Sequence, residues 1–421
     1  MDTIAVSKYS AKGKHVKTTK FITTDSPLLS TPYITRYPFD AGNCVIAIKG
    51  HTLVCSMGRE MYNGHQSNCI VSVNTATMGK LEHLSNYASH SFNQSLLATQ
   101  SGEIVYVNHG DAYPRGIEVE KQSLEEQTEW TPDVSTVPFH FYGEIGNNYT
   151  GAQLGGIAEV SSGYMLAAAA PKSLNSKANS QTRNVFVQLL DKSTLTSRLN
   201  ASTRKGTSGS ESVTDKGIKW LTNYSANYTA SAVSIVATDD DRVVVMWEKL
   251  NKNNVFLNSY YMILASNGQV LQKATSLRYR RLNVYEDPVY RNGYIYWTSA
   301  SGTAKNTTTY RMKISKLKVV KTLGKPEGLK TTGNWMYPAL IWEPLEGADG
   351  YELYRSTRKN GTYKKIKTLK ANSTTSYEDT SVSAFNGSYY YKIRGYMTVG
   401  SKKITGNFSK IVQSEKLSWG W

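Results

Sequence analysis

Short runs of residues that alternate between apolar and polar side chains follow one another along the chain, separated by Gly, Asn and Asp. The run Tyr351-Glu352-Leu353-Tyr354-Arg355 has this pattern. A period of two is typical of β-strands, and Gly, Asn and Asp are the residues that turns favour. The one helix-like patch, residues 123–128, is too short to form a stable helix. The pattern therefore predicts an all-β protein.

The strands predicted in the larger part of the chain fall into successive groups. Four groups of four strands span residues 44–84, 94–145, 152–223 and 231–275, and a fifth group covers residues 288–315. Repeated groups of four strands are typical of β-propeller blades. A single large sandwich and a β-helix remain open as alternatives.

The chain before the first group contains two further strands, residues 4–9 and 15–22. We expect this pair to complete the last blade and close a ring of five or six blades. Residues 196–216 are rich in Ser, Thr and Gly, and they predict a long mobile loop.

Beyond the fifth group the chain changes character at a Lys-rich stretch that ends at Pro326. Short strands follow at regular spacing, over residues 339–342, 351–355, 363–369, 376–378 and 389–396. Such spacing is typical of a β-sandwich. We therefore divide the chain into a propeller-like domain (1–317), a linker (318–325) and a sandwich domain (326–421).

Two motifs of the C-terminal region carry a family resemblance. Leu340-Ile341-Trp342 together with residues 347–356, and separately Tyr389-Tyr390-Tyr391-Lys392-Ile393-Arg394, resemble strands of the bacterial fibronectin type III family. The resemblance implies that Trp342 is the core tryptophan, and that Tyr389 is the corner tyrosine whose hydroxyl bonds back to the chain. It implies a fold and no chemistry, because such modules are usually spacers or weak adhesion units in exported bacterial proteins.

Several polar phrases of the large domain carry a second resemblance. Pro38-Phe39-Asp40-Ala41-Gly42, Ser89-His90-Ser91-Phe92-Asn93-Gln94 and residues 109–115 are similar to phrases in a group of exported, propeller-like proteins of Gram-positive gut anaerobes. That group has no assigned chemistry, so the resemblance implies export and fold only. Residues 23–36 are shorter than the matching stretch of the relatives, which would build another blade, so the blade number stays open.

The net charge of +17 indicates affinity for polyanions, with a solvated Lys-rich surface as the plain alternative. From Lys318 onward there are 17 Lys and Arg against 8 Asp and Glu, a surplus of 9 on about a quarter of the chain. The basic character is thus densest in the C-terminal domain, and no motif for base readout accompanies it. We expect no nucleic-acid partner.

Three cysteines, Cys44, Cys55 and Cys69, lie close together in the sequence without the spacing of a zinc or redox motif. Cys44 and Cys55 flank a predicted tight turn, so either a disulfide between them or buried free thiols is open. No apolar run is long enough to span a membrane, and the N-terminus lacks the pattern of a signal peptide. The chain is then either cytoplasmic or trimmed, and the resemblance favours an extracellular or cell-surface protein.

The best candidates for a ligand site are His65, His90, His109, Asp111 and Arg115, which lie at the starts or turns of two neighbouring blades. Histidine can act as a base, Asp can orient it, and Arg can hold an anion. We expect these side chains to converge near the propeller axis. The alternative is structural, because polar residues at blade starts commonly join neighbouring blades.

Other motifs point away from metal and cofactor chemistry. Three consecutive acids, Asp239-Asp240-Asp241, lack the alternating ligands of a calcium loop and predict a β-turn. No phosphate-binding loop, nucleophile elbow or zinc-protease helix is present in the sequence. We assign no cofactor, no metal and no catalytic residue.

These observations favour a secreted or surface-associated binding protein over an enzyme. The propeller would present a ligand face to a glycan, an anionic wall polymer or another protein, and the fibronectin-like domain would serve as a basic spacer. The alternative is a propeller enzyme that acts on a carbohydrate or sulfate ester, although the paired carboxylates of a glycosidase are not recognisable in the sequence.

Overall fold

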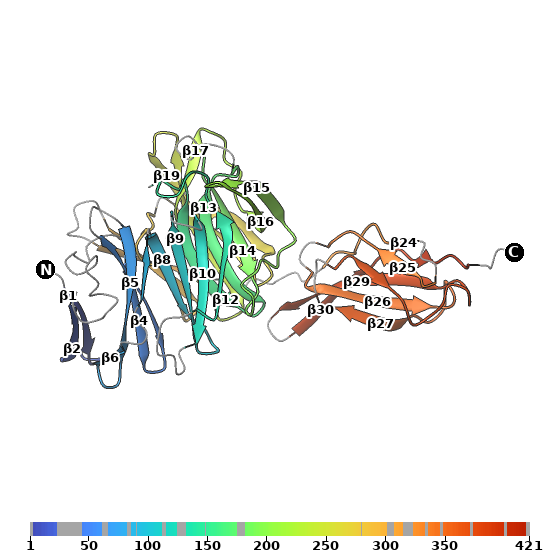
Figure 1. Cartoon of the computed structure of the whole chain (residues 1–421), viewed down its shortest axis with the longest axis horizontal. Coiled ribbons are helices and arrows are strands. Elements are labelled where there is room, and N and C mark those ends of the chain that lie inside the picture. Colours follow the sequence, from blue (N-terminus) through green and yellow to red (C-terminus); the bar gives the residue numbers. More distant parts are fainter. Residues whose placement is uncertain are drawn as a thin grey trace.

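The computed structural model describes residues 3–22, 44–60, 66–81, 86–89, 91–111, 115–123, 132–147, 149–174, 182–278, 280–300, 307–314, 323–332, 336–345, 348–370, 374–399 and 402–417. Every regular element in these ranges is a β-strand. The strands form a large N-terminal part and a smaller C-terminal part (Figure 1). The predicted all-β class is confirmed.

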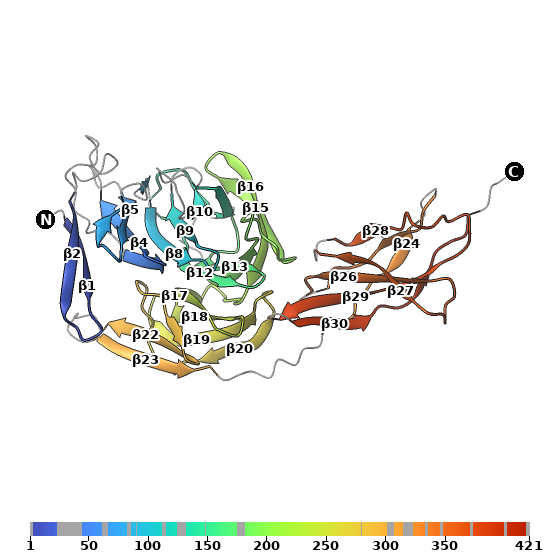
Figure 2. The same cartoon turned by 90° about the horizontal axis from the view of Figure 1, so that it is seen from below.

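Five antiparallel sheets stand around a common axis in the N-terminal part (Figure 2). Their strands are β3 (Cys44–Lys49), β4 (Thr52–Glu60), β5 (Gln66–Asn74), β6 (Gly79–Lys80) and β7 (Asn86–Ser89); β8 (Ser91–Ala98), β9 (Glu103–Gly110), β10 (Gly116–Ser123) and β11 (Val134–His140); β12 (Gln153–Val160), β13 (Gly163–Ala170), β14 (Asn184–Leu190), β15 (Ser202–Ser208) and β16 (Glu211–Trp220); β17 (Tyr228–Ala237), β18 (Arg242–Asn251), β19 (Phe256–Ala265) and β20 (Val270–Ser276); and β21 (Val289–Arg291), β22 (Tyr294–Ala300) and β23 (Thr307–Lys313). The groups match the predicted ones, and the domain is a β-propeller.

The first two strands, β1 (Thr3–Tyr9) and β2 (His15–Ile22), form a separate hairpin beside the β3–β6 sheet. Phe21 of the hairpin is buried against Val71 and its neighbours in that sheet, and the Thr19 hydroxyl donates to the Met78 carbonyl at 2.6 Å. In Figure 2 the hairpin occupies a sixth position, between the first and fifth sheets. The described strand pairings join β1 only to β2, so the hairpin does not extend the last blade as predicted.

The predicted loop over residues 196–216 is largely wrong, because the antiparallel strands β15 and β16 occupy most of it. The side chains that this hairpin buries are polar, among them Arg204, Ser208 and Asp215. Hydrogen bonds and an ion pair satisfy these groups, so a strand can be buried here without apolar residues. The alternation of apolar and polar residues therefore gives no sign of the hairpin.

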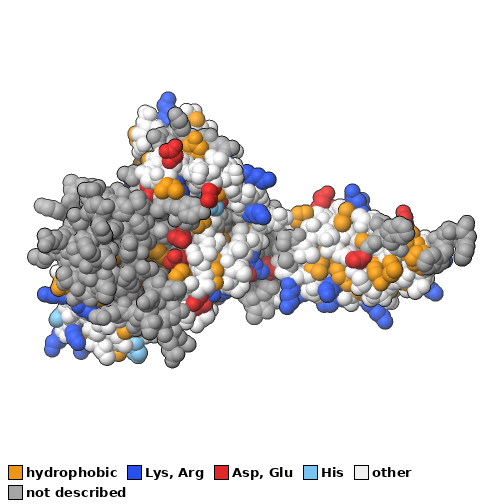
Figure 3. Space-filling view, viewed as in Figure 1, with side chains coloured by type: hydrophobic (Ala, Val, Ile, Leu, Met, Phe, Trp, Pro, Cys, Tyr) orange, Lys and Arg blue, Asp and Glu red, His pale blue; other side chains and the backbone are white. Residues whose placement is uncertain are grey.

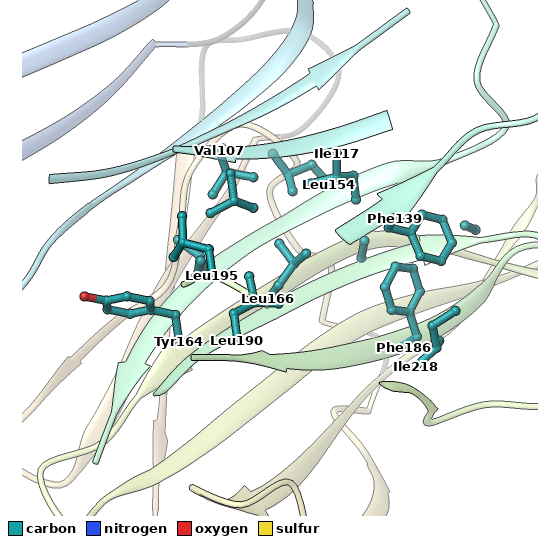
Figure 4. Packing of buried hydrophobic residues seen from close by; sticks show 14 of the residues in the cluster. Val107, Ile117, Phe139, Leu154, Tyr164, Leu166, Phe186, Leu190, Leu195 and Ile218 are labelled. Atoms are coloured by element: carbon teal, nitrogen blue, oxygen red, sulfur yellow. The ribbon is translucent and has the colours of Figure 1, made fainter. Parts of the chain in front are cut away.

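Apolar clusters between neighbouring sheets hold the ring together. In the cluster between the second and third sheets, Phe139 of β11 stacks on Phe186 of β14 with ring centroids 4.2 Å apart (Figure 4). Both rings are completely buried, and such burial contributes roughly 1.5–3 kcal/mol for each side chain. Similar clusters join the first sheet to the second, the third to the fourth and the fourth to the fifth.

The C-terminal part is a β-sandwich of two sheets. One contains β24 (Lys330–Thr332), β25 (Ala339–Ile341) and β28 (Ser376–Glu378); the other contains β26 (Gly350–Ser356), β27 (Lys364–Leu369), β29 (Tyr390–Val399), β30 (Lys402–Phe408) and β31 (Val412–Gln413). The two sheets confirm the predicted β-sandwich, whereas its membership of the fibronectin type III family stays a prediction. Of the predicted linker, residues 318–322 lie outside the described residues, and Leu323 is already buried against Met397 of the sandwich.

Trp342 is buried in the sandwich core as expected, with its ring edge-on to Tyr351 at 5.3 Å between centroids. The assignment of the corner tyrosine is corrected by two residues. Tyr391, rather than Tyr389, uses its hydroxyl to bond to an upstream residue, the Asp379 carboxylate at 3.0 Å. The reason is the direction of the side chains on β29: Tyr391 faces the core, where a polar hydroxyl requires a partner.

Candidate functional site

Two of the five predicted site residues, His65 and His90, lie outside the described residues. The other three lie at the junction of β9 and β10: His109 near the end of β9, Asp111 directly after it, and Arg115 directly before β10. All three are buried, with 5, 0 and 2% of their surfaces exposed. A ligand at the predicted site would therefore have to reach three side chains that are almost completely buried.

Arg115 holds in place the loop that connects the second sheet to the third. Its guanidinium donates to three main-chain carbonyls, those of Tyr142 at 3.3 Å, Asn147 at 2.8 Å and Tyr149 at 2.8 Å. Asp111 lies 4.0 Å from the same guanidinium. Burial lowers the pKa of Arg115, and the nearby Asp111 carboxylate offsets part of that effect. The donors that could hold an anion are thus directed at the protein's own backbone.

His109 faces the same loop. Its Nε2 lies 2.7 Å from the Thr150 hydroxyl, and its ring meets Phe141 edge-on at 4.9 Å between centroids. Burial, with a smaller contribution from the Arg115 charge, lowers the pKa of His109 to about 4, so the imidazole is neutral at pH 7. His109, Asp111 and Arg115 thus form one buried cluster whose contacts are with the protein itself. This arrangement fits the alternative that these residues have a structural role. A ligand-binding role for the five residues stays a prediction.

A different polar site lies where the inner strands of the sheets converge. A cavity of about 20 Å³, room for about one water molecule, opens there among residues of β3, β8, β12 and β17 and of the segment before β21. Its polar lining includes Gln94, Ser95, Ser234, Asn283, Glu286 and Asp287. None of the described residues that line it is Lys or Arg. We call this cavity the axial niche.

Asp287 is the distinctive residue of the axial niche. Its side chain is accessible to solvent, yet protein surrounds it closely enough that burial raises the pKa of its carboxyl to about 6. Among the described residues the carboxylate has no hydrogen-bond or ion-pair partner, whereas Asp215, Glu248 and Glu352 are all paired. An unpaired carboxylate in a concave site is a candidate functional group.

Gly156 lies beside this carboxylate. A β-carbon at position 156 would be in ordinary van der Waals contact with Asp287 Oδ1 at 3.5 Å and with Ser95 Oγ at 3.4 Å, so it is the backbone φ of +99°, and not lack of space, that favours glycine here. The neighbouring acid is held differently, because Glu286 accepts a hydrogen bond from the Thr298 hydroxyl. Glu286 and Asp287 therefore differ in their hydrogen bonding, since only Glu286 has a partner among the described residues.

Sequence reasoning missed Asp287, although one signal was present. Two acids, Glu286 and Asp287, come just before Pro288 and the first strand of the fifth blade, where residues face the propeller axis. Asp239, Asp240 and Asp241 do form the predicted turn. Their carboxylates bond to three separate partners, Tyr290, Arg242 and Ser161. In the described part of the chain no group of three or more His, Cys, Asp and Glu could hold a metal ion.

A larger cleft of about 730 Å³ lies where the third and fourth sheets meet the sandwich. Arg198, Lys216 and Trp220 line it from the propeller, and Pro344 and Asp349 line it from the sandwich. Asp349 is the one carboxylate among its described lining residues, so the cleft offers no carboxylate pair for acid–base chemistry.

Comparisons with known proteins give no family for this chain. No protein-family model matches it, and no curated protein matches it significantly. Among the described residues no helix is long and apolar enough to cross a membrane.

The solved structures that resemble this chain include a GH43 protein, an endo-arabinase and a Fn3-like protein. A GH43 protein from Bacillus licheniformis is 10% identical over 97% of this chain and 87% of its own, with a TM-score of 0.28. An endo-arabinase from Bacteroides thetaiotaomicron is 9% identical over 66% of this chain and 95% of its own, with a TM-score of 0.36. A Fn3-like protein from Clostridium thermocellum is 27% identical over 21% of this chain and 86% of its own, with a TM-score of 0.18. At these TM-scores the likenesses carry no information about chemistry.

Proposed function

We propose that this protein binds a neutral carbohydrate at the axial niche of its propeller, outside the cell. The observation that carries the proposal is the carboxylate of the exposed residue Asp287, which lies in a concave site and has no partner among the described residues. Carboxylate, amide and hydroxyl groups are the donors and acceptors that sugar hydroxyls require.

The composition of the niche favours a neutral ligand over an anion. Ser95, Ser234 and Asn283 offer polar groups without positive charge, and the described lining supplies no Lys or Arg. Tyr285, also part of the lining, exposes 64% of its surface and can cover the apolar face of a sugar ring. Because the niche holds about one water molecule, we expect one hydroxyl of a sugar to enter it while the ring stays at the mouth.

Hydrolysis of a carbohydrate is the second candidate, and Asp287 is again the observation that favours it. A carboxyl with a pKa near 6 is partly protonated at neutral pH and suits a general acid. Hydrolysis also requires a second carboxylate, which the described lining offers only as Glu286. If the protein is a hydrolase, its hydrolytic activity should fall as the pH rises through about 6, because Asp287 then loses the proton that a general acid donates.

The test compares Asp287→Asn with the wild type on soluble polysaccharides, arabinan and bacterial wall glycans among them, and measures both binding and release of reducing ends. Glu144→Gln, which removes an exposed carboxylate elsewhere on the propeller, is the control. We expect Asp287→Asn to weaken binding at least tenfold and Glu144→Gln to leave it unchanged. Loss of turnover with binding retained would select hydrolysis. Equal behaviour of Asp287→Asn and the wild type would refute both candidates.

A further inference from the structure

The three cysteines share one face of the first sheet. Met57 on β4 lies opposite Cys44 on β3 and opposite Cys69 on β5, and Cys55 precedes Met57 by two residues on the same face. Cys44 is exposed, whereas Cys55 and Cys69 expose 5 and 0% of their surfaces. Cys55 therefore lies diagonally across from the exposed residue Cys44 on the neighbouring strand.

The sulfur atoms of Cys44 and Cys55 are in contact, 3.4 Å apart. A disulfide bond has a length of about 2.05 Å, so the sulfurs would have to approach by roughly 1.4 Å. Cys44 is the first residue of β3, and β3 is the edge strand of its sheet on the side nearest the propeller axis. A shift of Cys44 therefore disturbs few backbone hydrogen bonds. We propose that Cys44 and Cys55 are a site of disulfide formation, which fastens the inner strand β3 to β4 in an oxidising environment.

The two thiols differ in the way that the reaction requires. Contact with Cys55 lowers the pKa of Cys44 to about 7, while contact with Cys44 and burial raise the pKa of Cys55. The Cys44 thiolate is therefore the group that attacks an external disulfide such as oxidised glutathione. It forms a mixed disulfide and releases one glutathione thiolate. In the mixed disulfide Cys44 no longer carries a negative charge beside Cys55, so Cys55 can lose its proton. The Cys55 thiolate then attacks Cys44 Sγ, and the second glutathione leaves as a thiolate that takes up this proton. Two cysteines and one oxidised glutathione thus yield one cystine and two glutathione thiols.

The bond would fix the part of the sheet that is nearest the axis. Val45, the residue after Cys44, lines the axial niche. On the opposite face of the same strand Ile46 and Ile48 expose 60 and 53% of their surfaces. The inner strand is thus packed on one face only, and a covalent link to β4 restrains it where side-chain packing does not.

The experiment oxidises the native full-length protein with oxidised glutathione and counts free thiols after denaturation. We expect three thiols before oxidation and one after it, with a peptide map that links Cys44 to Cys55. The variant Cys69→Ser should go from two thiols to none, and Cys44→Ser should keep both of its thiols. Oxidation should raise the melting temperature of the wild type and of Cys69→Ser, and leave that of Cys44→Ser unchanged.

Three results would overturn the proposal. One is that all three thiols remain free after oxidation. Another is a map that links Cys55 to Cys69. The third is glutathione retained on Cys44 as a stable mixed disulfide, because Cys55 would then have failed to displace it.

Discussion

The guanidinium of Arg204 on β15 donates two hydrogen bonds, of 2.6 and 3.1 Å, to one carboxylate oxygen of Asp215 on β16. His140 at the end of β11 bonds to the other carboxylate oxygen at 2.6 Å. Arg204 also lies over the Phe139 ring, 3.7 Å from its centroid. Both members of the pair are buried, so this polar cluster ties the outer hairpin of the third sheet to the second sheet.

Replacing Asp215 by Asn should therefore be strongly destabilising. The substitution keeps the size of the side chain but leaves the Arg204 charge buried without its counter-ion, a loss of about 3–5 kcal/mol in the free energy of unfolding. Urea denaturation checks this value, with Lys205→Gln on the exposed face of the same hairpin as the control. A variant no less stable than the control would mean that water reaches the Arg204 guanidinium.

His109 should make stability depend on pH. Its pKa is about 4 in the folded protein and about 6.5 when unfolded, so the unfolded chain binds more protons between these values and stability falls as the pH falls. The difference amounts to about 3 kcal/mol across the window. Asp287 has the opposite effect, because its raised pKa favours the folded state at low pH.

The variant His109→Gln isolates the histidine from other titrating groups. Its unfolding free energy, measured in urea at pH 7 and pH 4.5, should decrease less on acidification than that of the wild type. Equal decreases in the two proteins would show that His109 is already accessible to protons in the folded state.

Replacing Trp342 by Ala should unfold the sandwich and leave the propeller folded. Truncation of a buried Trp costs about 3–5 kcal/mol, a large share of the stability of a small domain. Scanning calorimetry should lose one transition and keep the other. Loss of both transitions would contradict the division of the chain into two independent domains, which stays a prediction from the sequence.

Brief trypsin digestion should cut first within residues 313–325. This stretch is rich in Lys, and we expect a linker to make few tertiary contacts before Leu323, which is already buried in the sandwich. Gel electrophoresis should then show fragments of roughly 35 and 11 kDa, from the domain lengths at about 110 Da per residue. First cleavage within residues 196–216 would be unexpected, because paired strands cover most of that segment and Arg204 is buried.

The sandwich should bind anionic polymers weakly and in a salt-sensitive way. Lys365, Arg394 and Lys403 surround Glu352 at 3.1, 2.8 and 2.8 Å, which leaves a positive surplus on one sheet. Burial alone would raise the pKa of Glu352, but bonds from these cations outweigh it and lower the pKa to about 2. Figure 3 shows Lys and Arg side chains interspersed with apolar ones along the sandwich.

The double variant Lys365→Gln with Lys403→Gln should lose retention on heparin and on anionic wall polymer. The control removes two exposed propeller charges, through Lys205→Gln with Lys252→Gln. Salt at 1 M should abolish wild-type retention, because the Debye length falls to about 3 Å. If the two double variants elute at the same salt concentration, the sandwich charge serves solubility only.

The sequence predicted most of the fold because one face of most strands is apolar. The hairpin of β15 and β16 escaped notice because it buries Arg204 and Asp215, and a buried ion pair gives no alternation of apolar and polar residues. The sequence predicted that the polar residues His109, Asp111 and Arg115 lie together. It did not predict that their side chains bond to a loop of the protein itself. Asp287 was missed because its setting depends on sheets that are distant in the sequence and meet only at the axis.

The N-terminal hairpin has a mechanical consequence. Its described core contacts are with the β3–β6 sheet, which follows it in the chain, and no described apolar cluster joins it to β21–β23. Each apolar cluster described between units of the propeller thus links units that are consecutive in sequence, as in a linear repeat array whose ends have been brought together. Under load or denaturant such an array frays from its ends, so we expect the junction between β1–β2 and β21–β23 to open first and the third and fourth sheets to unfold last.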